Sequence, residues 1–384
     1  MADGSLRKLY FVVGEPSGDA LGAAVLQALN ADGDAKFDPV GLGGTALRAE
    51  GLQSLFEIDH LSVMGFGPVI ARLPDLMRRV GLVVNDIVAK RPEAVLLIDS
   101  PEFCTQVAKR VRKRLPNIPI VKYVCPSIWA WRPGRALKMA RYIDHVLCLL
   151  PFEPAALERL GGPTGTYVGH PLVTSMAQWH NRATNALPDA DGSIQALLLP
   201  GSRKAEIARS LPVFLVVAQH LASRHNMSFV LPTLDRREAQ VRDLLATSSL
   251  PVEVIVGDDA RREAVARAHV AMATSGTISL ELGLGRVPHA IYYEASGLEK
   301  LASRFITTWS VNLPNLILDE PVVPECVGDA AKAERLLREI DALAHPGPAR
   351  DRHAQGYERL WQATATDIPP AELAAQALRR AAKL

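Results

Sequence analysis

A strand, a tight turn and the start of a helix follow one another in the segment Ala196–Ile207 of this 384-residue chain. An apolar run ends at Pro200, Gly201 and Ser202 form the turn, and a helical pattern begins just after Arg203. The first turn of a helix presents unpaired N–H groups and a positive dipole end, which together bind anions. The Arg203 guanidinium is planar and suits phosphate. We therefore predict an anion site at Gly201, Ser202 and Arg203; an ordinary turn with a surface arginine is the alternative.

A second helix start with the same properties follows a short apolar strand at Val270–Met272. Ser275–Thr277 are placed to bind phosphate, and Glu281 lies about one helical turn further, where its carboxylate suits a ribose diol. The polar loop 312–315 is a candidate to close on the same ligand. An ordinary helix-surface carboxylate is the alternative for Glu281. The predicted ligand-binding residues here are Ser275, Gly276, Thr277, Glu281 and Asn315.

An acidic residue stands at the tip of a buried strand, because Asp99 directly follows the apolar run Ala94–Ile98. Partial burial at such a position raises a carboxyl pKa toward neutrality, which suits a general base. A helix N-cap is the alternative, since Asp99 and Ser100 both belong to residue types that cap helices. We favour the general base.

The loop after the first predicted strand, Leu9–Val13, carries further acidic residues. Glu15 and Asp19 stand among glycines that let a ligand approach the backbone, and their carboxylates suit sugar hydroxyls. Glu15 and Asp19 are additional catalytic candidates, and Ser17 a substrate-binding one. A polar turn with a helix cap at Ser17 is the alternative.

Aromatic and basic residues gather in the segment 123–135, with Trp129 and Trp131 beside Arg132. This combination suits a sugar-phosphate site or a membrane interface, and we predict that these three residues bind substrate. Aromatic core packing is the alternative. Segments 63–84 and 107–115 also interleave apolar and basic residues, which indicates an anionic surface as partner. The basic residues concerned are Arg72, Arg78, Arg79, Lys109, Arg110, Arg112, Arg132 and Arg135.

Apolar strands alternate with helical patterns along most of the chain, which predicts parallel sheets covered by helices. The expected strands are 9–13, 37–40, 94–98, 120–124, 144–149, 194–199, 229–230, 252–256, 270–272 and 289–292. A polar stretch at 179–193 reads as a linker between two Rossmann-like halves. We expect a first domain over 1–178, a second over 190–345, and C-terminal helices over 346–384 that pack back on the first domain.

Composition excludes several classes of protein. Hydrophobic residues make up 48% and charged residues 22% of the chain, and a net charge of +2 gives no nucleic-acid signature. The cysteines, Cys104, Cys125, Cys148 and Cys326, lack paired spacing, which argues against a zinc site or a disulfide framework. The chain shows no signal-peptide core and no apolar run long enough to cross a bilayer, so we expect a protein that is soluble or lies on a membrane.

A set of motifs, in one order from the first strand to about Glu325, resembles the lipid-A-disaccharide synthase family. The motifs are Gly14–Asp19, Leu61–Gly65, Asp99–Phe103, Pro126–Arg132, Leu150–Glu153, Gly169–His170, Leu199–Arg203, Ser275–Thr277 with Glu281, and Leu313–Asn315. Pro16 stands where the family often has Thr, Cys104 where it often has Asn, and Cys125 where it often has Ser. The departures at Cys104 and Cys125 put polar contacts at those two positions in doubt.

The resemblance implies an α/β protein with the GT-B fold, in which two Rossmann-like domains face each other across a cleft. It implies transfer of a diacylated glucosamine from UDP to diacylglucosamine 1-phosphate, giving the β-1,6 disaccharide of lipid A without a metal or other cofactor. Arg203 and the helix start at Ser275 would stabilise the departing UDP, and Asp99 would deprotonate the acceptor 6-hydroxyl. The implied location is the cytoplasmic face of a Gram-negative inner membrane. Monomer and homodimer both stay open.

Other functions stay open from the residues alone. A UDP-sugar 2-epimerase, a transferase with a soluble acceptor, and a non-catalytic lipid- or nucleotide-binding protein are the nearest alternatives. A dinucleotide dehydrogenase would use the G-x-G-x-x-A loop Gly41–Ala46, which follows the second strand rather than the first. The Asp-x-Asp strings Asp32–Asp34 and Asp189–Asp191 lie in loops away from the strand ends, so we expect no metal-diphosphate site.

Overall fold

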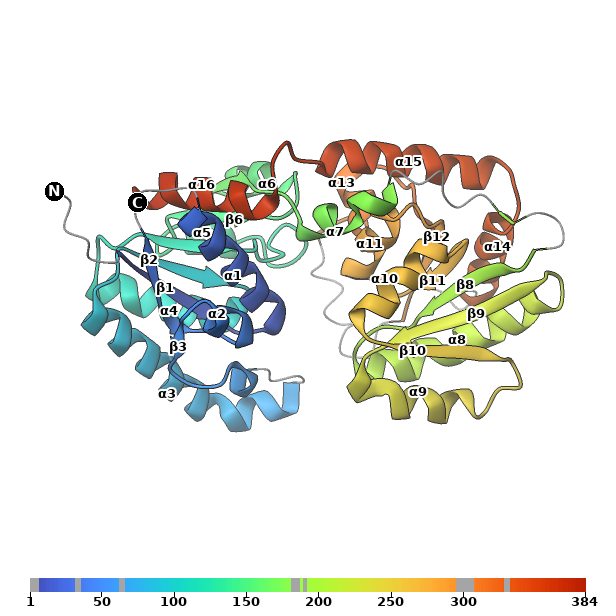
Figure 1. Cartoon of the computed structure of the whole chain (residues 1–384), viewed down its shortest axis with the longest axis horizontal. Coiled ribbons are helices and arrows are strands. Elements are labelled where there is room, and N and C mark those ends of the chain that lie inside the picture. Colours follow the sequence, from blue (N-terminus) through green and yellow to red (C-terminus); the bar gives the residue numbers. More distant parts are fainter. Residues whose placement is uncertain are drawn as a thin grey trace. The chain divides into compact units, whose positions relative to one another are not determined.

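The chain forms two compact units in a computed structural model (Figure 1). The structure describes residues 7–31, 36–61, 66–180, 187–188, 192–294, 307–327 and 332–384, without the side chains of residues 59, 60 and 66–72. Unit 1 comprises Met1–Pro171 together with Thr366–Leu384, and unit 2 comprises Leu172–Ala365.

Unit 1 contains a parallel sheet in the order β3-β2-β1-β4-β5-β6-β7. Its strands are β1 (Arg7–Val13), β2 (Phe37–Leu42), β3 (Gln53–Ser54), β4 (Ala94–Ile98), β5 (Ile120–Tyr123), β6 (His145–Cys148) and β7 (Thr164–Tyr167). Its helices are α1 (Pro16–Ala31), α2 (Thr45–Ala49), η1 (Ile58–Leu61), α3 (Phe66–Lys90), α4 (Pro101–Arg114), α5 (Arg135–Met139), α6 (Glu153–Arg159) and α16 (Pro370–Ala382).

The central strand β4 explains why this sheet is buried on both sides. Val95 and Leu97 join the core that α3 and α4 cover, whereas Leu96 and Ile98 join the core that α1 and α16 cover. Side chains alternate along a strand, so a strand covered on both faces needs an uninterrupted apolar run.

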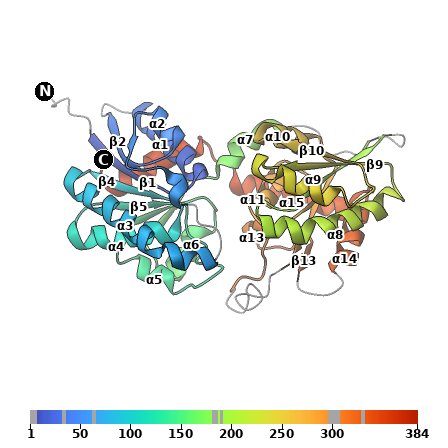
Figure 2. The ribbon, with the colours of Figure 1, turned by 90° about the horizontal axis from the view of Figure 1, so that it is seen from below.

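Unit 2 contains a second parallel sheet in the order β10-β9-β8-β11-β12-β13. Figure 2 labels β9, β10 and β13 of this sheet. Its strands are β8 (Ile194–Leu199), β9 (Met227–Thr233), β10 (Val252–Val256), β11 (Val270–Ala273), β12 (His289–Tyr293) and β13 (Glu325–Val327). Its helices are α7 (Pro171–His180), α8 (Lys204–Ala222), η2 (Asp235–Arg237), α9 (Glu238–Leu245), α10 (Asp258–Arg267), α11 (Thr277–Leu284), α13 (Leu313–Leu318), α14 (Lys332–Leu343) and α15 (Pro348–Thr364). In the described ranges, no helix is long and apolar enough to cross a membrane.

The C-terminal helices separate, which corrects the expectation that residues 346–384 pack together on the first domain. Helix α16 packs on α1 within unit 1, where Arg379 donates to the Leu29 carbonyl at 2.6 Å. Helix α15 instead packs on α11 and α13 in unit 2, and the buried Tyr357 hydroxyl contacts Nδ1 of His289 at 2.8 Å. The boundary near residue 365 therefore falls between these two helices.

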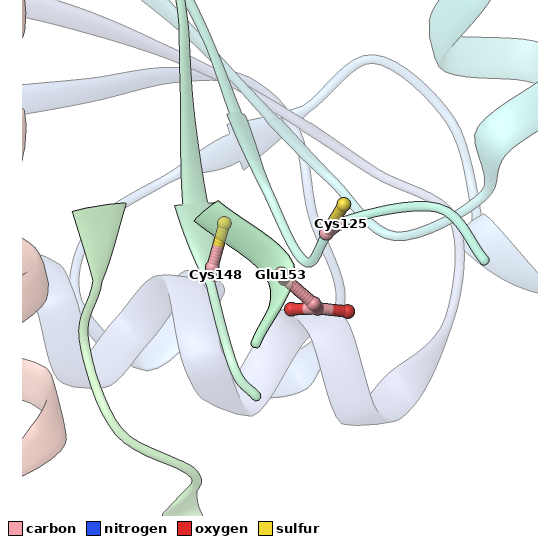
Figure 3. Close-up of side chains that lie close together, drawn as sticks. All are labelled: Cys125, Cys148 and Glu153. Carbon is pink, nitrogen blue, oxygen red and sulfur yellow. The ribbon is translucent and has the colours of Figure 1, made fainter. Parts of the chain in front are cut away.

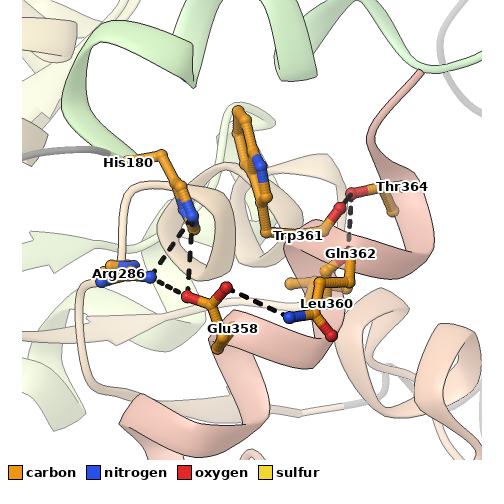
Figure 4. Close-up of polar contacts among 7 residues, drawn as sticks. All are labelled: His180, Arg286, Glu358, Leu360, Trp361, Gln362 and Thr364. Atoms are coloured by element: carbon orange, nitrogen blue, oxygen red, sulfur yellow. Dashed lines mark hydrogen bonds and ion pairs between the residues drawn. The ribbon is translucent and has the colours of Figure 1, made fainter. Parts of the chain in front are cut away.

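The other boundary falls at Pro171, because α7 is fastened inside unit 2 rather than unit 1 (Figure 4). The His180 ring stacks on Trp361 of α15 with 3.9 Å between centroids. Arg286 donates to His180 Nε2 at 3.3 Å and pairs with Glu358. The helix that opens unit 2 and the helix that ends it are thus held together by stacked rings and a shared cation.

Candidate functional site

A pocket of about 400 Å³ opens in unit 2 at the carboxyl ends of its parallel strands. It lies at the topological switch point between β8 and β11, where the strand order of the sheet reverses. Open α/β sheets bind ligands at this position. The lining residues are Leu199, Gly201, Ser202, Arg203, Glu206, Pro232, Thr233, Leu234, Gly257, Asp258, Arg261, Thr274, Ser275, Gly276, Thr277 and Ile278. Both predicted helix starts thus belong to one pocket.

The helix start at Arg203 differs from the prediction in one respect. The Glu206 carboxylate already accepts from the backbone N–H of Ser202 at 3.1 Å and, more weakly, of Arg203 at 3.5 Å. Gly201 has φ +105°, and a Cβ there would collide with the same carboxylate. The backbone donors of this turn are therefore capped by an internal anion. The exposed Arg203 side chain is the part left for a ligand.

The helix start at Ser275 keeps its open donors. Gly276 has φ +144°, and the space that its Cβ would fill is empty. The Ser275 hydroxyl donates to the Val311 carbonyl at 2.5 Å, which joins this turn to the loop before α13. The first N–H groups of α11 and its positive dipole end therefore line the pocket.

Glu281 is not among the residues that line the pocket, but it contacts one of them. Its side chain is buried and pairs with Arg261, while its Oε1 has no partner among the described residues. Burial raises the pKa of Glu281, and the Arg261 charge opposes this shift. Arg261 itself lines the pocket and also pairs with Asp258 at 3.2 Å. Sequence reasoning missed Arg261, because nothing in the pattern separates it from its neighbour Arg262.

Asn315 is likewise a structural contact in this structure. Its buried amide donates to the Val323 carbonyl at 2.9 Å and to Glu325 at 2.8 Å, and its oxygen accepts from Val323 N at 2.8 Å. These hydrogen bonds join α13 to the segment leading into β13, and the loop before α13 also contacts Ser275. Ligand binding by Asn315 stays a prediction.

Unit 1 has its own switch point, between β1 and β4. The turns that follow these strands touch there, since a Cβ on Gly14 would lie 1.8 Å from the Ser100 hydroxyl. Asp99 and Ser100 both have left-handed backbone angles, with φ of +50° and +40°. Such angles cost about 1–3 kcal/mol each in non-glycine residues and concentrate at functional sites. Asp99 is half-buried and accepts from its neighbour's N–H at 3.0 Å.

The first loop separates the acidic candidates. Glu15 and Ser17 are exposed at the start of α1, whereas Asp19 is buried. The Asp19 carboxylate accepts from the backbone N–H of Gly44 at 2.6 Å and of Ala46 at 2.7 Å. Asp19 therefore caps the glycine loop and α2, which leaves Glu15 as the candidate in this loop. The Asp19 carboxylate thus occupies backbone N–H groups of the G-x-G-x-x-A loop. A dinucleotide dehydrogenase would need these N–H groups to bind a phosphate.

Lys122 is a residue that sequence reasoning missed. It lies buried within β5, and its ammonium donates to the Asp99 carbonyl. Burial lowers the pKa of Lys122, while Cys104 and Asp99 oppose that shift. A lysine inside an apolar strand, between Val121 and Tyr123, was the available signal. The contact holds the strained turn that presents Asp99.

Replacing Lys122 with Met is expected to slow turnover about tenfold, because a hydrogen bond from a charged group contributes roughly 1.5–3 kcal/mol. The UDP binding that the resemblance implies should stay unchanged, since Lys122 is in the other unit from the pocket. Steady-state kinetics and UDP titration measure both effects, with Lys113→Met at an exposed position of α4 as the control. Wild-type turnover in Lys122→Met would show that the Asp99 turn holds its shape without the ammonium.

The aromatic segment divides into a packed part and an exposed part. Trp129 packs edge-on against Phe152 with 5.0 Å between centroids, and its indole N–H donates to Glu153 at 3.2 Å. Trp131 is 36% exposed, and the exposed Arg132 side chain lies over its ring at 5.1 Å. Trp131 and Arg132 are therefore accessible, whereas Trp129 is partly buried against Phe152 and Glu153. Substrate binding by these three residues stays a prediction.

Some predicted residues lie outside the described part of the chain. They are Asp32 and Asp34, Asp189 and Asp191, the motif positions 62–65, and the side chain of Arg72. Others of the basic set are paired: Arg78 and Arg79 with Asp75, Arg112 with Asp144, and Arg135 with Glu102.

Each unit is a Rossmann-like domain, and the chain has the GT-B fold, as its likeness to solved structures shows. A putative UDP-N-acetylglucosamine 2-epimerase from Listeria monocytogenes is similar, with a TM-score of 0.62, 14% identity and coverage of 99% of this chain and 96% of that one. Acinetobacter baumannii MurG gives 0.60, 13% identity and coverage of 98% and 100%. At these identities the likeness shows the fold.

The sequence comparisons identify the family. Residues 9–363 match the family model for lipid-A-disaccharide synthetase. The lipid-A-disaccharide synthase of Rhodopseudomonas palustris strain HaA2 is 41% identical over 367 residues, covering 93% of this chain and 91% of the relative. That of Ruegeria pomeroyi is 40% identical, covering 98% and 95%. The chain belongs to the lipid-A-disaccharide synthase family, and it is a glycosyltransferase, as the motifs predicted.

Proposed function

We propose that this enzyme transfers 2,3-diacylglucosamine from its UDP derivative to 2,3-diacylglucosamine 1-phosphate, forming the β-1,6 disaccharide of lipid A and UDP. The family match over residues 9–363 carries this proposal. The pocket of unit 2 supports it, because it combines phosphate-binding chemistry with the position at which α/β sheets bind nucleotides.

The donor diphosphate is held by positive charge from side chains and backbone. Arg203, Arg261 and the N-terminus of α11 line one pocket, and charge grows on the departing UDP as its bond to the sugar breaks. These groups stabilise that charge in place of a metal ion. Gly257, with φ +104° and open space at its Cβ position, lets the nucleotide approach the backbone.

The acceptor is activated in unit 1. The half-buried Asp99 carboxylate takes the proton from the acceptor 6-hydroxyl while the hydroxyl oxygen attacks the anomeric carbon. The new C–O bond forms as the bond to UDP breaks, so one displacement inverts the anomeric centre. Exposed Glu15 and Ser17 flank the neighbouring turn and bind the acceptor sugar.

Mass spectrometry of the products tests this function directly. Purified enzyme given both acylated glucosamine substrates should release UDP and a tetraacyl disaccharide 1-phosphate. UDP-N-acetylglucosamine supplied alone should be returned unchanged, whereas conversion to its 2-epimer would favour an epimerase. A disaccharide formed with a soluble, unacylated acceptor would favour a transferase of different specificity.

The acyl chains of both substrates place the enzyme at a membrane, and we propose that it lies on the cytoplasmic face of the bacterial inner membrane. An exposed apolar and basic patch in unit 1 supports this: Trp131 is 36% exposed and Leu137 59% exposed. Arg132, Lys138 and Arg141 are exposed around them. Amphipathic surfaces of this kind bind anionic headgroups.

The double variant Lys138→Glu/Arg141→Glu is expected to bind anionic vesicles more than about tenfold less tightly at low salt, since each basic residue contributes roughly 1 kcal/mol. Wild-type binding should fall as salt screens these charges. Flotation with anionic and neutral vesicles measures both effects, and Arg338→Glu at an exposed position of α14 in unit 2 is the control. Equal binding of wild type and double variant would place the membrane contact elsewhere.

A further inference from the structure

Glu153 is a buried carboxylate in unit 1 with 3% of its surface exposed. One oxygen accepts from the indole N–H of Trp129 at 3.2 Å. The other accepts from the backbone N–H of Leu149 at 3.0 Å and of Leu150 at 3.1 Å. All three of these partners of the carboxylate are therefore hydrogen-bond donors.

These contacts join two loops at the carboxyl edge of the sheet. Trp129 belongs to the loop after β5, and Leu149 and Leu150 follow β6 directly. The edge-on contact between Trp129 and Phe152 strengthens the same junction. Two residues beyond Trp129, the chain presents the exposed pair Trp131 and Arg132.

The surroundings of Glu153 make this arrangement costly. The buried thiols of Cys125 and Cys148 flank the carboxylate, and the three ligand-type atoms lie within 4.8 Å of one another (Figure 3). Burial raises the pKa of Glu153 to about 7, and its hydrogen bonds oppose that shift. A buried carboxylate is stable only where donors satisfy it, so its position depends on all three N–H groups.

Metal binding is a poorer explanation of this cluster. It would require both thiols to lose their protons. A hydrogen bond with Cys148, followed by burial and the Glu153 charge, raises the pKa of the Cys125 thiol. The N–H donors already in place account for the carboxylate without a cation.

We propose that Glu153 is a positioning residue, which fixes Trp129 and thereby orients the exposed Trp131–Arg132 tip for the acylated glucosamine acceptor. This inference rests on the proposed function. The buried contact that holds the acceptor-binding loop is thereby a third feature of the enzyme, besides the donor pocket and the candidate base. Trp129 acts through its contact with Glu153.

The test compares Glu153→Gln, Trp129→Phe and the double variant, with Glu158→Gln on the exposed face of α6 as the control. Gln places an N–H₂ against N–H donors, whereas Phe removes only the indole donor, so Trp129→Phe still informs if Glu153→Gln folds poorly. Each single variant should raise the acceptor KM about tenfold, the loss expected for a hydrogen bond to a buried charge. The double variant should add little, because both changes break one contact. UDP affinity should be unchanged in all four.

A second readout separates this inference from the proposed function. With fluorotryptophan incorporated, the ¹⁹F resonance missing from Trp129→Phe is that of Trp129; Glu153→Gln should shift it and Glu158→Gln should not. A shifted resonance without disaccharide synthesis by wild type would overturn the proposed function while leaving the anchor in place. A wild-type acceptor KM in both single variants, or an equal loss of UDP affinity, would overturn the positioning role.

Discussion

Asp99→Asn is expected to lower turnover by about 10²–10⁴-fold, the usual effect of removing a general base, while UDP affinity stays unchanged. Asn keeps the size of the side chain and tolerates the left-handed backbone angle found at this position. The change therefore removes basicity and preserves the turn. The pocket that we propose binds UDP lies in unit 2, so the substitution leaves its lining unchanged. Turnover and UDP titration, measured side by side, provide the test.

The helix-cap alternative predicts the opposite result, because Asn caps helices about as well as Asp. Retained turnover in Asp99→Asn would favour the cap, and the base would then be sought at Glu15 or Glu102. Asp19 is no longer a candidate, since backbone N–H groups hold its buried carboxylate. A parallel loss of UDP affinity would contradict a role confined to the acceptor.

Arg203→Ala is expected to lower turnover by about 10²-fold or more and to weaken UDP binding, because it removes a charged donor where negative charge develops. The backbone N–H groups of Ser202 and Arg203 cannot compensate, since Glu206 already caps them. Steady-state kinetics and UDP titration measure both effects. Lys204→Ala is the matched control, because this exposed cation is adjacent in sequence but is absent from the pocket lining.

Arg203→Lys adds a second comparison. Lysine retains the charge but loses the planar pair of donors, so an intermediate loss of turnover is expected. Wild-type kinetics in Arg203→Ala would show that Arg203 is an ordinary surface arginine with no role in binding the diphosphate. The diphosphate would then depend on Arg261 and the start of α11.

The sequence by itself determined most of the strands and the turns that carry the candidate site residues. Buried parallel strands are uninterrupted apolar runs, so Ala94–Ile98 and Ile194–Leu199 can be read directly, together with the turns that follow them. Asp99 and Arg203 could be selected because their positions depend only on those local patterns. Short strands with little apolar character, such as β3 and β7, escaped the same reasoning.

Only the tertiary structure decided which polar side chains are free to meet a ligand. Asp19, in the first turn of α1, was selected from the sequence, yet its carboxylate accepts from the backbone N–H groups of Gly44, Ala46 and Leu47. Glu281 was selected from the sequence, whereas its partner Arg261, which lines the pocket, was not. Trp129 and Trp131 were selected together, and only the structure shows that Trp131 is exposed while Trp129 packs against Phe152. Local patterns determine secondary structure, but burial and hydrogen-bond partners arise from contacts between segments far apart in the sequence. Helices α15 and α16 belong to different units for the same reason. Each helix packs on the core that its apolar face covers.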